Sequence, residues 1–272
     1  RSTKKGGVLG VMSPPMIATG RNTIADMFRA CGYTTAAIGK WHLGWDWTYK
    51  EGKAKTVDNI DFTKRVANGP TDRGFDYFYG LTSPSGPPYL YMVNDMAKKQ
   101  PNTRFEDSGG GLYRIKGGIG HSDWSADGMQ PHLADKMLDY LDDNKNSDKP
   151  FFLYMALTAP HIPLFPSKEF KGKSKIGDYG DLVMMIDDIV GRVNRKLKEI
   201  GKYDNTIVMF AADNGCAGYI NMDRINRKGH YPSYIYRGYK SHGWEGGHRI
   251  PFILSWGDRY GHCLLYTSPS PR

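Results

Sequence analysis

The stretch Gly32–Gly44, G-Y-T-T-A-A-I-G-K-W-H-L-G, is the most informative part of the sequence for the fold, because it predicts a short strand directly after a helix. Thr34–Ile38 is β-prone and bounded by glycines, which predicts a strand. Upstream, Thr23 and Asp26 form a variant of the capping box, which predicts a helix that ends near Cys31, where a glycine follows. A helix, a glycine and a strand in this order begin an α/β pattern.

Two polar side chains follow this predicted strand. Lys40 and His42 are two residues apart, and extended backbone would place both on one side. A lysine and a histidine at the carboxyl end of a strand are suited to hold an oxyanion and to move a proton. On spacing alone, a solvent-exposed lysine beside a histidine at the edge of the core remains an alternative.

The α/β pattern continues toward the carboxyl terminus. Amphipathic spacing predicts helices, and continuous apolar runs predict buried strands in a sheet that is covered by helices on both faces. The predicted helices are Pro131–Leu141 and Asp178–Ile200, and the predicted strands are Phe151–Leu157, Thr206–Ala212 and Ile250–Trp256.

The segment Trp45–Gly128 differs from the rest. It is rich in Gly, Pro, Asn and aromatic residues and shows little periodicity, which is typical of functional loops or small insertions. Its aromatic side chains could stack on sugars or could fill the core. Arg73, Asp76, Asn94 and Asp95 are the weaker candidates for substrate contacts in this segment.

The composition narrows the class of protein. The 272 residues are 39% hydrophobic and 13% aromatic, so a folded core is expected. A net charge of +9 can attract anionic substrates, although Lys and Arg scattered over solvated faces would give the same value. No dense basic block with interleaved aromatic residues occurs, so no nucleic-acid partner is expected. No apolar run reaches the roughly 18 residues that a transmembrane helix needs. The cysteines, Cys31, Cys216 and Cys263, have no metal-ligand spacing.

Asp213-Asn214-Gly215 is the candidate metal site. It follows an apolar strand, and it supplies a carboxylate and an amide oxygen. Hard cations such as calcium take six to eight oxygen ligands of this kind. Taken alone, D-N-G is more often a turn.

Two further side chains are candidates for catalysis. His161 lies between Pro160 and Pro163, and a stiff proline-flanked backbone would hold its imidazole steady. Lys240 lies five residues before Glu245, in a loop that ends in two glycines. The alternatives are a structural histidine and an ordinary surface lysine.

These segments together resemble the sulfatase family. Gly32–Gly44 is similar to the second signature of that family, including its G-K-W-H-L-G ending. Four later segments follow in the order that the family would predict, and the resemblance covers about nine tenths of the chain. These are R-G-F-D-Y-F-Y-G at Arg73–Gly80, the strand and A-P-H of Phe151–Leu164, D-N-G at Asp213–Gly215, and K-S-H-G-W-E-G-G at Lys240–Gly247.

The resemblance implies the α/β/α sandwich of the alkaline phosphatase superfamily, with a mostly parallel central sheet that is incomplete at both ends. It implies one catalytic domain over residues 1–260. Residues 261–272, which end in L-L-Y-T-S-P-S-P-R, are expected to be a non-native tail, since they resemble a translated adaptor.

The resemblance also implies roles for the candidate residues. In the family, a formylglycine made from Cys or Ser attacks sulfur, and a divalent metal, here expected to be Ca2+, helps to hold the sulfate. Asp213 and Asn214 would bind the metal, while Lys40 would bridge the sulfate and the formylglycine. Lys240 would bind the sulfate and the leaving oxygen, and His161 would protonate the leaving alcohol.

Three further residues receive expected roles, that of His42 from the same resemblance and those of Glu245 and His242 from their place in the lysine-bearing loop. His42 would take the proton from the remaining hydroxyl of the sulfated formylglycine hydrate, which releases sulfate. Glu245 would fix the lysine-bearing loop. His242 would lie near the substrate.

The motif that carries the nucleophile, C-x-P-S/A-R, does not occur in the chain; Met12–Met16, M-S-P-P-M, lacks both its Cys and its Arg. We therefore expect the formylglycine upstream of Arg1, and an inactive fragment. The resemblance to bacterial sulfatases implies a periplasmic or secreted enzyme that acts on a sulfated small molecule or a sulfated polysaccharide. A phosphoester or phosphonate hydrolase of the same superfamily, or a non-catalytic homologue that binds sulfated glycans, is the alternative.

Overall fold

The computed structural model describes residues 9–257 and 264–267. The chain divides into two compact units. Unit 1 comprises Arg1–Tyr140 and Asn146–Glu169, and unit 2 comprises Leu141–Lys145 and Phe170–Arg272.

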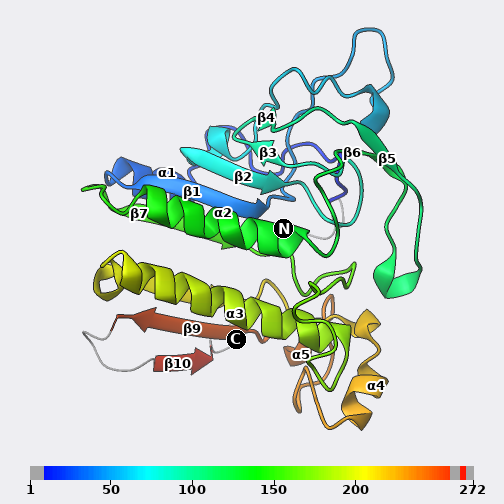
Figure 1. The fold of residues 1–272 in the computed structure, drawn as a ribbon, viewed down its shortest axis with the longest axis vertical. Coiled ribbons are helices and arrows are strands. Elements are labelled where there is room, and N and C mark those ends of the chain that lie inside the picture. Colours follow the sequence, from blue (N-terminus) through cyan, green and yellow to red (C-terminus); the bar gives the residue numbers. More distant parts are fainter. Residues whose placement is uncertain (1–8, 258–263, 268–272) are drawn as a thin grey trace. The chain divides into compact units, whose positions relative to one another are not determined.

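Unit 1 is built on a five-stranded mixed sheet in the order β4-β3-β2-β1-β7 (Figure 1). Its three longer strands, β1 (Thr34–Lys40), β2 (Tyr77–Leu81) and β7 (Phe151–Ala156), run parallel. The short strands β3 (Met92–Val93) and β4 (Met96–Ala97) are antiparallel additions beside β2. The carboxyl ends of the three parallel strands therefore lie at one edge of the sheet.

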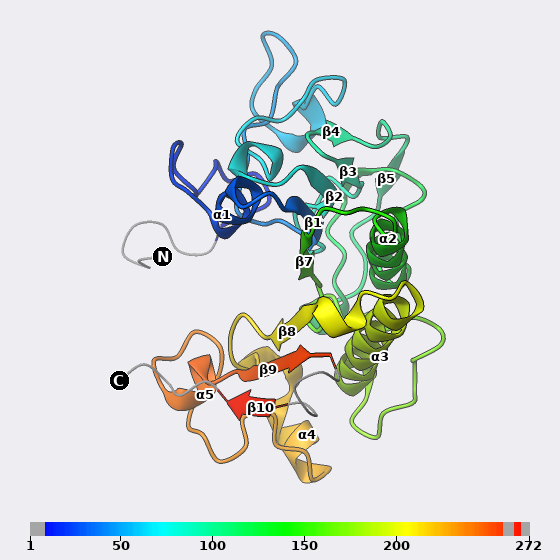
Figure 2. The ribbon, with the colours of Figure 1, turned by 90° about the vertical axis from the view of Figure 1, so that its left-hand side faces the viewer.

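Helices cover both faces of this sheet. Helix α1 (Ile24–Ala30) and helix α2 (Met129–Asp143) lie on opposite sides of it (Figure 2). Successive residues of β1 point to opposite faces, so Ala37 packs in the core that contains Ala25 of α1, whereas Ile38 packs in the core that contains Leu133 of α2. This alternation gives unit 1 an α/β/α arrangement.

The amino-terminal helix confirms its predicted capping. The Thr23 hydroxyl accepts a hydrogen bond from the Asp26 backbone N–H at 3.2 Å, and the Asp26 carboxylate accepts one from the Thr23 N–H at 3.0 Å. Gly32, with φ of 84°, turns the chain into β1.

The remaining elements of unit 1 are short. β5 (Thr103–Phe105) and β6 (Gly118–Gly120) form an antiparallel pair. Three 3-10 turns span Val57–Asn59, Thr71–Arg73 and Gly111–Tyr113.

Unit 2 combines one long helix with a three-stranded antiparallel sheet in the order β10-β9-β8. The strands are β8 (Ile207–Ala211), β9 (Pro251–Trp256) and β10 (Leu264–Thr267). The helices are α3 (Asp178–Glu199), α4 (Met222–Arg227) and α5 (Glu245–His248), and 3-10 turns span Tyr203–Asn205 and Gly218–Ile220. Helix α3 carries an apolar stripe whose buried members include Leu182, Met185, Ile189 and Val193.

The predicted α/β class and the mixed, mostly parallel central sheet are confirmed. The predicted helices and strands are present, with ends that shift by one or two residues. The description of Trp45–Gly128 as irregular was wrong in one important respect, because this segment contributes β2 to the centre of the sheet.

Two strands are less buried than predicted. In β7 the Tyr154 side chain is 49% exposed, and in β8 the Met209 side chain is 62% exposed. Among the described residues both are the outermost strands of their sheets, so each has a strand neighbour there on one side alone. In the tail, residues 264–267 form β10, while 261–263 and 268–272 lie outside the described residues, and its non-native origin stays a prediction. None of the helices described here is long and apolar enough to cross a membrane.

Candidate active site

The candidate residues fall into two sets, one in each unit. Lys40, His42 and His161 belong to unit 1, and Asp213, Asn214 and Lys240 belong to unit 2.

Lys40 is the last residue of β1, and the backbone before it is tightly constrained. Gly39 has φ of 125°, and a Cβ at this position would meet the carbonyl group of Ala156 in β7. On the other side, Gly39 pairs with Gly80 of β2. Only glycine fits between these two strands, so the position of Lys40 depends on a close approach of three backbones.

His42 does not continue the strand as the sequence predicted. β1 ends at Lys40, and His42 adopts a left-handed conformation with φ of 44°. The extended spacing that would place Lys40 and His42 on one side therefore does not apply. Its neighbour Trp41 is 7% exposed and donates its indole N–H to the carbonyl of Gly44 at 3.0 Å, which fixes this turn. Non-glycine residues in this region are uncommon and gather at functional sites.

His161 lies in the loop that follows β7. β1 and β7 are parallel neighbours, with Gly39 opposite Ala156, so this loop begins at the sheet edge where Lys40 ends β1. The His161 Nδ1 lies 2.7 Å from the carbonyl oxygen of Ile162. A carbonyl only accepts, so Nδ1 carries the proton and Nε2 is the nitrogen suited to exchange one.

In unit 2 the D-N-G loop and the lysine-bearing loop are held together by hydrogen bonds between their backbones. The Gly215 N–H donates to the carbonyl of Gly247 at 3.0 Å, and the Lys240 N–H donates to the carbonyl of Cys216 at 2.8 Å. A Cβ on Gly215 would meet the Gly246 carbonyl, so the two loops approach too closely for any side chain there. The structure therefore brings Lys240 next to the loop of Asp213 and Asn214.

The donor set of this loop suits a hard cation. Asp213 is exposed and Asn214 half-buried, and within the described part of the chain neither side chain has a hydrogen-bond or ion-pair partner. Their carboxylate and amide oxygens are ligands of the kind that calcium prefers. Among residues 9–257 and 264–267, no group of three or more His, Cys, Asp or Glu could hold a metal ion. Asp213 and Asn214 fit calcium, but they supply only part of its usual coordination.

Glu245 and His242 lie in the lysine-bearing loop. Glu245 binds Arg249 at 2.7 Å across one turn of α5, in keeping with the structural role expected of it. The His242 ring lies 4.1 Å from the ring of Tyr239, and its backbone N–H donates to the carbonyl of Tyr239. Arg237 stacks on Trp244 with 4.1 Å between the guanidinium carbon and the ring centre.

The weaker candidates in unit 1 have structural partners. Arg73 is 5% exposed, and its guanidinium donates to the carbonyl of Ile17 at 2.9 Å and to the side chain of Asn68 at 2.9 Å. The Asn94 side-chain oxygen accepts from the Phe78 N–H at 3.0 Å. These bonds do not support the predicted substrate contacts of Arg73 and Asn94.

The two weaker acidic candidates are also engaged. Asp95 forms an ion pair with Arg65 at 2.8 Å. The Asp76 carboxylate accepts from the backbone N–H and the hydroxyl of Thr35 at 2.9 and 3.0 Å. Asp76 thus links β1 to the segment before β2.

One buried and one half-buried group near these loops were not predicted. Gln130, at the start of α2, accepts hydrogen bonds from Thr158 in the loop of His161. Nothing in the local sequence marks this pair, because it joins two segments that are 28 residues apart. In unit 2, Cys216 directly follows the D-N-G loop, and burial raises the pKa of its thiol, which keeps it protonated.

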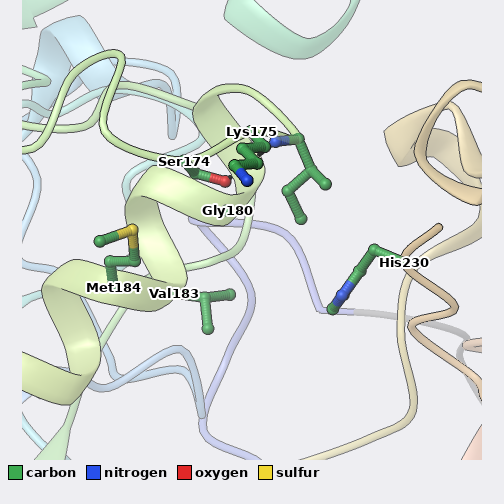
Figure 3. Close-up of a pocket in the computed structure, with 7 residues that line it drawn as sticks. Ser174, Lys175, Gly180, Val183, Met184 and His230 are labelled. Atoms are coloured by element: carbon green, nitrogen blue, oxygen red, sulfur yellow. Dashed lines mark hydrogen bonds between the residues drawn. The ribbon is translucent and has the colours of Figure 1, made fainter. Parts of the chain in front are cut away.

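A pocket of about 280 Å³ lies elsewhere in unit 2 (Figure 3). Val183 and Met184 of α3 and Ile176 before it form the apolar part of its lining, while Ser174, Lys175 and His230 supply the polar groups. The pocket contains none of the residues predicted for catalysis or metal binding.

A sequence profile of the family described as Sulfatase matches residues 2–268. The chain belongs to the sulfatase family. The N-acetylgalactosamine-6-O-sulfatase of Bacteroides thetaiotaomicron is 30% identical to it, over 92% of this chain and 54% of that protein. The arylsulfatase of Hemicentrotus pulcherrimus is 32% identical, over 86% of this chain and 38% of that protein.

Solved sulfatase structures share the fold. One from the glycosaminoglycan-metabolising locus of Bacteroides thetaiotaomicron superposes with a TM-score of 0.76 at 27% identity, covering 93% of this chain and 58% of that one. The PsFucS1 sulfatase from Pseudoalteromonas sp. superposes with a TM-score of 0.59 at 26% identity, covering 89% and 48%. The chain thus spans about half the length of these relatives, and the predicted sulfatase membership is confirmed.

Proposed function

We propose that this chain is part of a sulfatase that hydrolyses sulfate esters of glycans, with a formylglycine nucleophile and one calcium ion. The observation that carries the proposal is the pair of interlocked loops in unit 2, which sets Lys240 beside Asp213 and Asn214 through two backbone hydrogen bonds. A cation and an ammonium group side by side suit an anion such as sulfate.

In this proposal Asp213 and Asn214 hold the calcium ion, and the other ligands come from outside the chain. When bound, calcium draws charge from the sulfate oxygens, and the formylglycine supplies the nucleophile. Lys40 and Lys240 bind the oxygens of the sulfate and offset the charge that grows on them.

The two histidines move protons. His161, with Nδ1 donating to the Ile162 carbonyl, protonates the leaving alcohol through Nε2. His42 takes up the proton that has to leave before sulfate is released.

A glycan is the proposed substrate for two reasons. Several of the most similar curated relatives, from bacteria and mammals, are described as N-acetylgalactosamine-6-sulfatases. A net charge of +9 favours the approach of a polyanion such as a sulfated polysaccharide. An enzyme for such polymers is proposed to be periplasmic or secreted.

The test begins with the gene. Sequencing upstream of Arg1 should reveal C-x-P-S/A-R or S-x-P-S/A-R, preceded by acidic metal ligands and an export signal. An intact upstream region without the Cys or Ser would remove the nucleophile, and a glycan-binding protein would then be the better account.

The full-length protein is then assayed. We expect turnover of 4-nitrophenyl sulfate and of N-acetylgalactosamine 6-sulfate, and we expect a chelator and Asp213→Ala each to reduce it by at least about 100-fold. Faster turnover of 4-nitrophenyl phosphate than of the sulfate would overturn the proposal in favour of a phosphoester hydrolase. Asp223→Ala, an acidic residue of helix α4, is the matched control and should retain activity.

A further inference from the structure

The loop that carries His161 is anchored to helix α2 by a single buried side chain. Gln130, in the first turn of α2, is 2% exposed, and Thr158 is 5% exposed. The Gln130 Oε1 accepts from the Thr158 hydroxyl at 2.6 Å and from the Thr158 backbone N–H at 3.2 Å. One carboxamide oxygen thus satisfies both donors of Thr158.

Two hydrogen bonds in series connect Gln130 to His161, with Thr158 between them. The Thr158 carbonyl accepts from the His161 backbone N–H at 3.1 Å, so the place of Thr158 fixes the backbone of His161. The imidazole is then oriented by its own bond from Nδ1 to the Ile162 carbonyl at 2.7 Å. A shift of Thr158 would therefore be passed to the nitrogen that exchanges a proton.

The other end of the Gln130 amide is unusual. Its Nε2 is buried and has no hydrogen-bond partner among the described residues. An unmet buried donor is unfavourable, and such groups are rare in folded proteins. The chain thus tolerates the unsatisfied Nε2 of Gln130, whose Oε1 holds Thr158.

We propose that Gln130 and Thr158 are positioning residues that hold His161 in the orientation needed to protonate the leaving group. The proposal rests on the function proposed above, in which His161 is the general acid. A general acid matters most when the leaving alcohol is a weak acid, and it matters little when the leaving group is already acidic. Loss of its positioning should show the same dependence.

The experiment measures kcat and KM of the full-length enzyme on substituted phenyl sulfates and on a sugar sulfate. Gln130→Leu keeps the size of the side chain but removes the acceptor. We expect it to lower kcat by about 10- to 100-fold on phenyl sulfate and the sugar sulfate, and by less than about 3-fold on 4-nitrophenyl sulfate, with KM little changed. Gln130→Glu keeps an acceptor oxygen and should recover most of the activity.

A second pair of variants tests the same anchor from the loop. Thr158→Val removes the hydroxyl donor, and Thr158→Ser retains it, so only the valine variant should show the leaving-group dependence. Gln100→Leu is the matched control, because the Gln100 amide donates to the carbonyl of Phe62, far along the chain from the His161 loop. Its kcat should stay within about 3-fold of the parent on every substrate.

His161→Ala separates the two proposals. If its loss of kcat is the same for all leaving groups, the general-acid role in the proposed function is wrong. If His161→Ala shows the dependence but Gln130→Leu and Thr158→Val do not, the positioning role alone is overturned. In the double variant, Gln130→Leu should cause no further loss beyond that of His161→Ala, and an additive loss would also contradict the positioning role.

Discussion

His132 shows how one side chain ties the helix layer to the sheet in unit 1. Its Nε2 lies 2.7 Å from the Tyr79 hydroxyl, and the Lys98 ammonium donates to the same hydroxyl at 3.0 Å. An ammonium only donates, so the Tyr79 oxygen accepts from Lys98 and can give its own proton to a neutral His132. Burial, together with the positive charges of Lys98 and Lys136, lowers the pKa of His132, while Asp123 and Asp135 oppose this shift. Burial also raises the pKa of Tyr79 to about 12.

This arrangement predicts a pH dependence of stability. The pKa of His132 is lower in the folded protein than the roughly 6.5 of an unfolded chain, so the unfolded chain takes up the proton first. The contribution of His132 is therefore complete above about pH 6.5 and falls as the pH drops below that value. We expect the melting temperature to decrease between pH 7.5 and 5.5, and His132→Gln to flatten that decrease. His230→Gln, at an exposed histidine, should leave the slope unchanged; an unchanged slope in His132→Gln would contradict the prediction.

At the residue scale the sequence predicted which elements carry the candidate residues, while their roles stay predictions. Lys40, His161, Asp213 and Lys240 each end, follow or flank a recognisable strand or glycine turn. The structure places Lys40 at the end of β1 and the other three in loops. The left-handed φ of His42 was not predictable, because the spacing of Lys40 and His42 does not reveal the turn that the Trp41 indole closes on the Gly44 carbonyl. The bond between Gln130 and Thr158 was not predictable, because it joins segments that are 28 residues apart. The buried bonds of Arg73 were missed for the same reason.

At the scale of elements, the helices with clear periodicity and the longer apolar strands were predictable. β2 was not predictable, because Tyr77–Leu81 is short, contains two tyrosines and a glycine, and lies in a segment with little hydrophobic periodicity. Its place beside β1 is decided by packing, since Phe78 and Tyr79 point into the two different cores.

The end of β1 gives the prediction at this scale. Gly39→Ala would place a methyl group against the Ala156 carbonyl in a residue whose φ is 125°. We expect a loss of at least about 2 kcal/mol in the free energy of unfolding, because strain and a backbone clash act together. Urea unfolding measures the loss. Gly110→Ala, where a Cβ meets nothing within 4 Å, is the control and should change stability little; equal effects of the two changes would contradict the account.

At the scale of the whole molecule, the proposed calcium site offers a measurable contrast. Asp213 and Asn214 would give a calcium ion only part of the six to eight oxygen ligands it takes. We expect the chain of 272 residues to bind calcium with a Kd of about 1 mM or weaker by calorimetry, and the full-length protein to bind it much more tightly. Asp213→Ala should abolish the residual binding, whereas Asp223→Ala should not. Micromolar binding by the chain alone would show that the ligand set is already complete within it.

The interlocked glycines of unit 2 have a consequence for protein engineering and for divergence among related genes. A Cβ on Gly215 would meet the Gly246 carbonyl, and the Lys240 N–H donates to the carbonyl of Cys216. Because of these two contacts, neither loop can accept an insertion at them while the other stays unchanged. Recombination with a relative should therefore succeed when residues 213–216 and 237–247 are inherited from the same parent. In a chimera with a crossover between them, the two loops would come from different parents and would no longer fit each other.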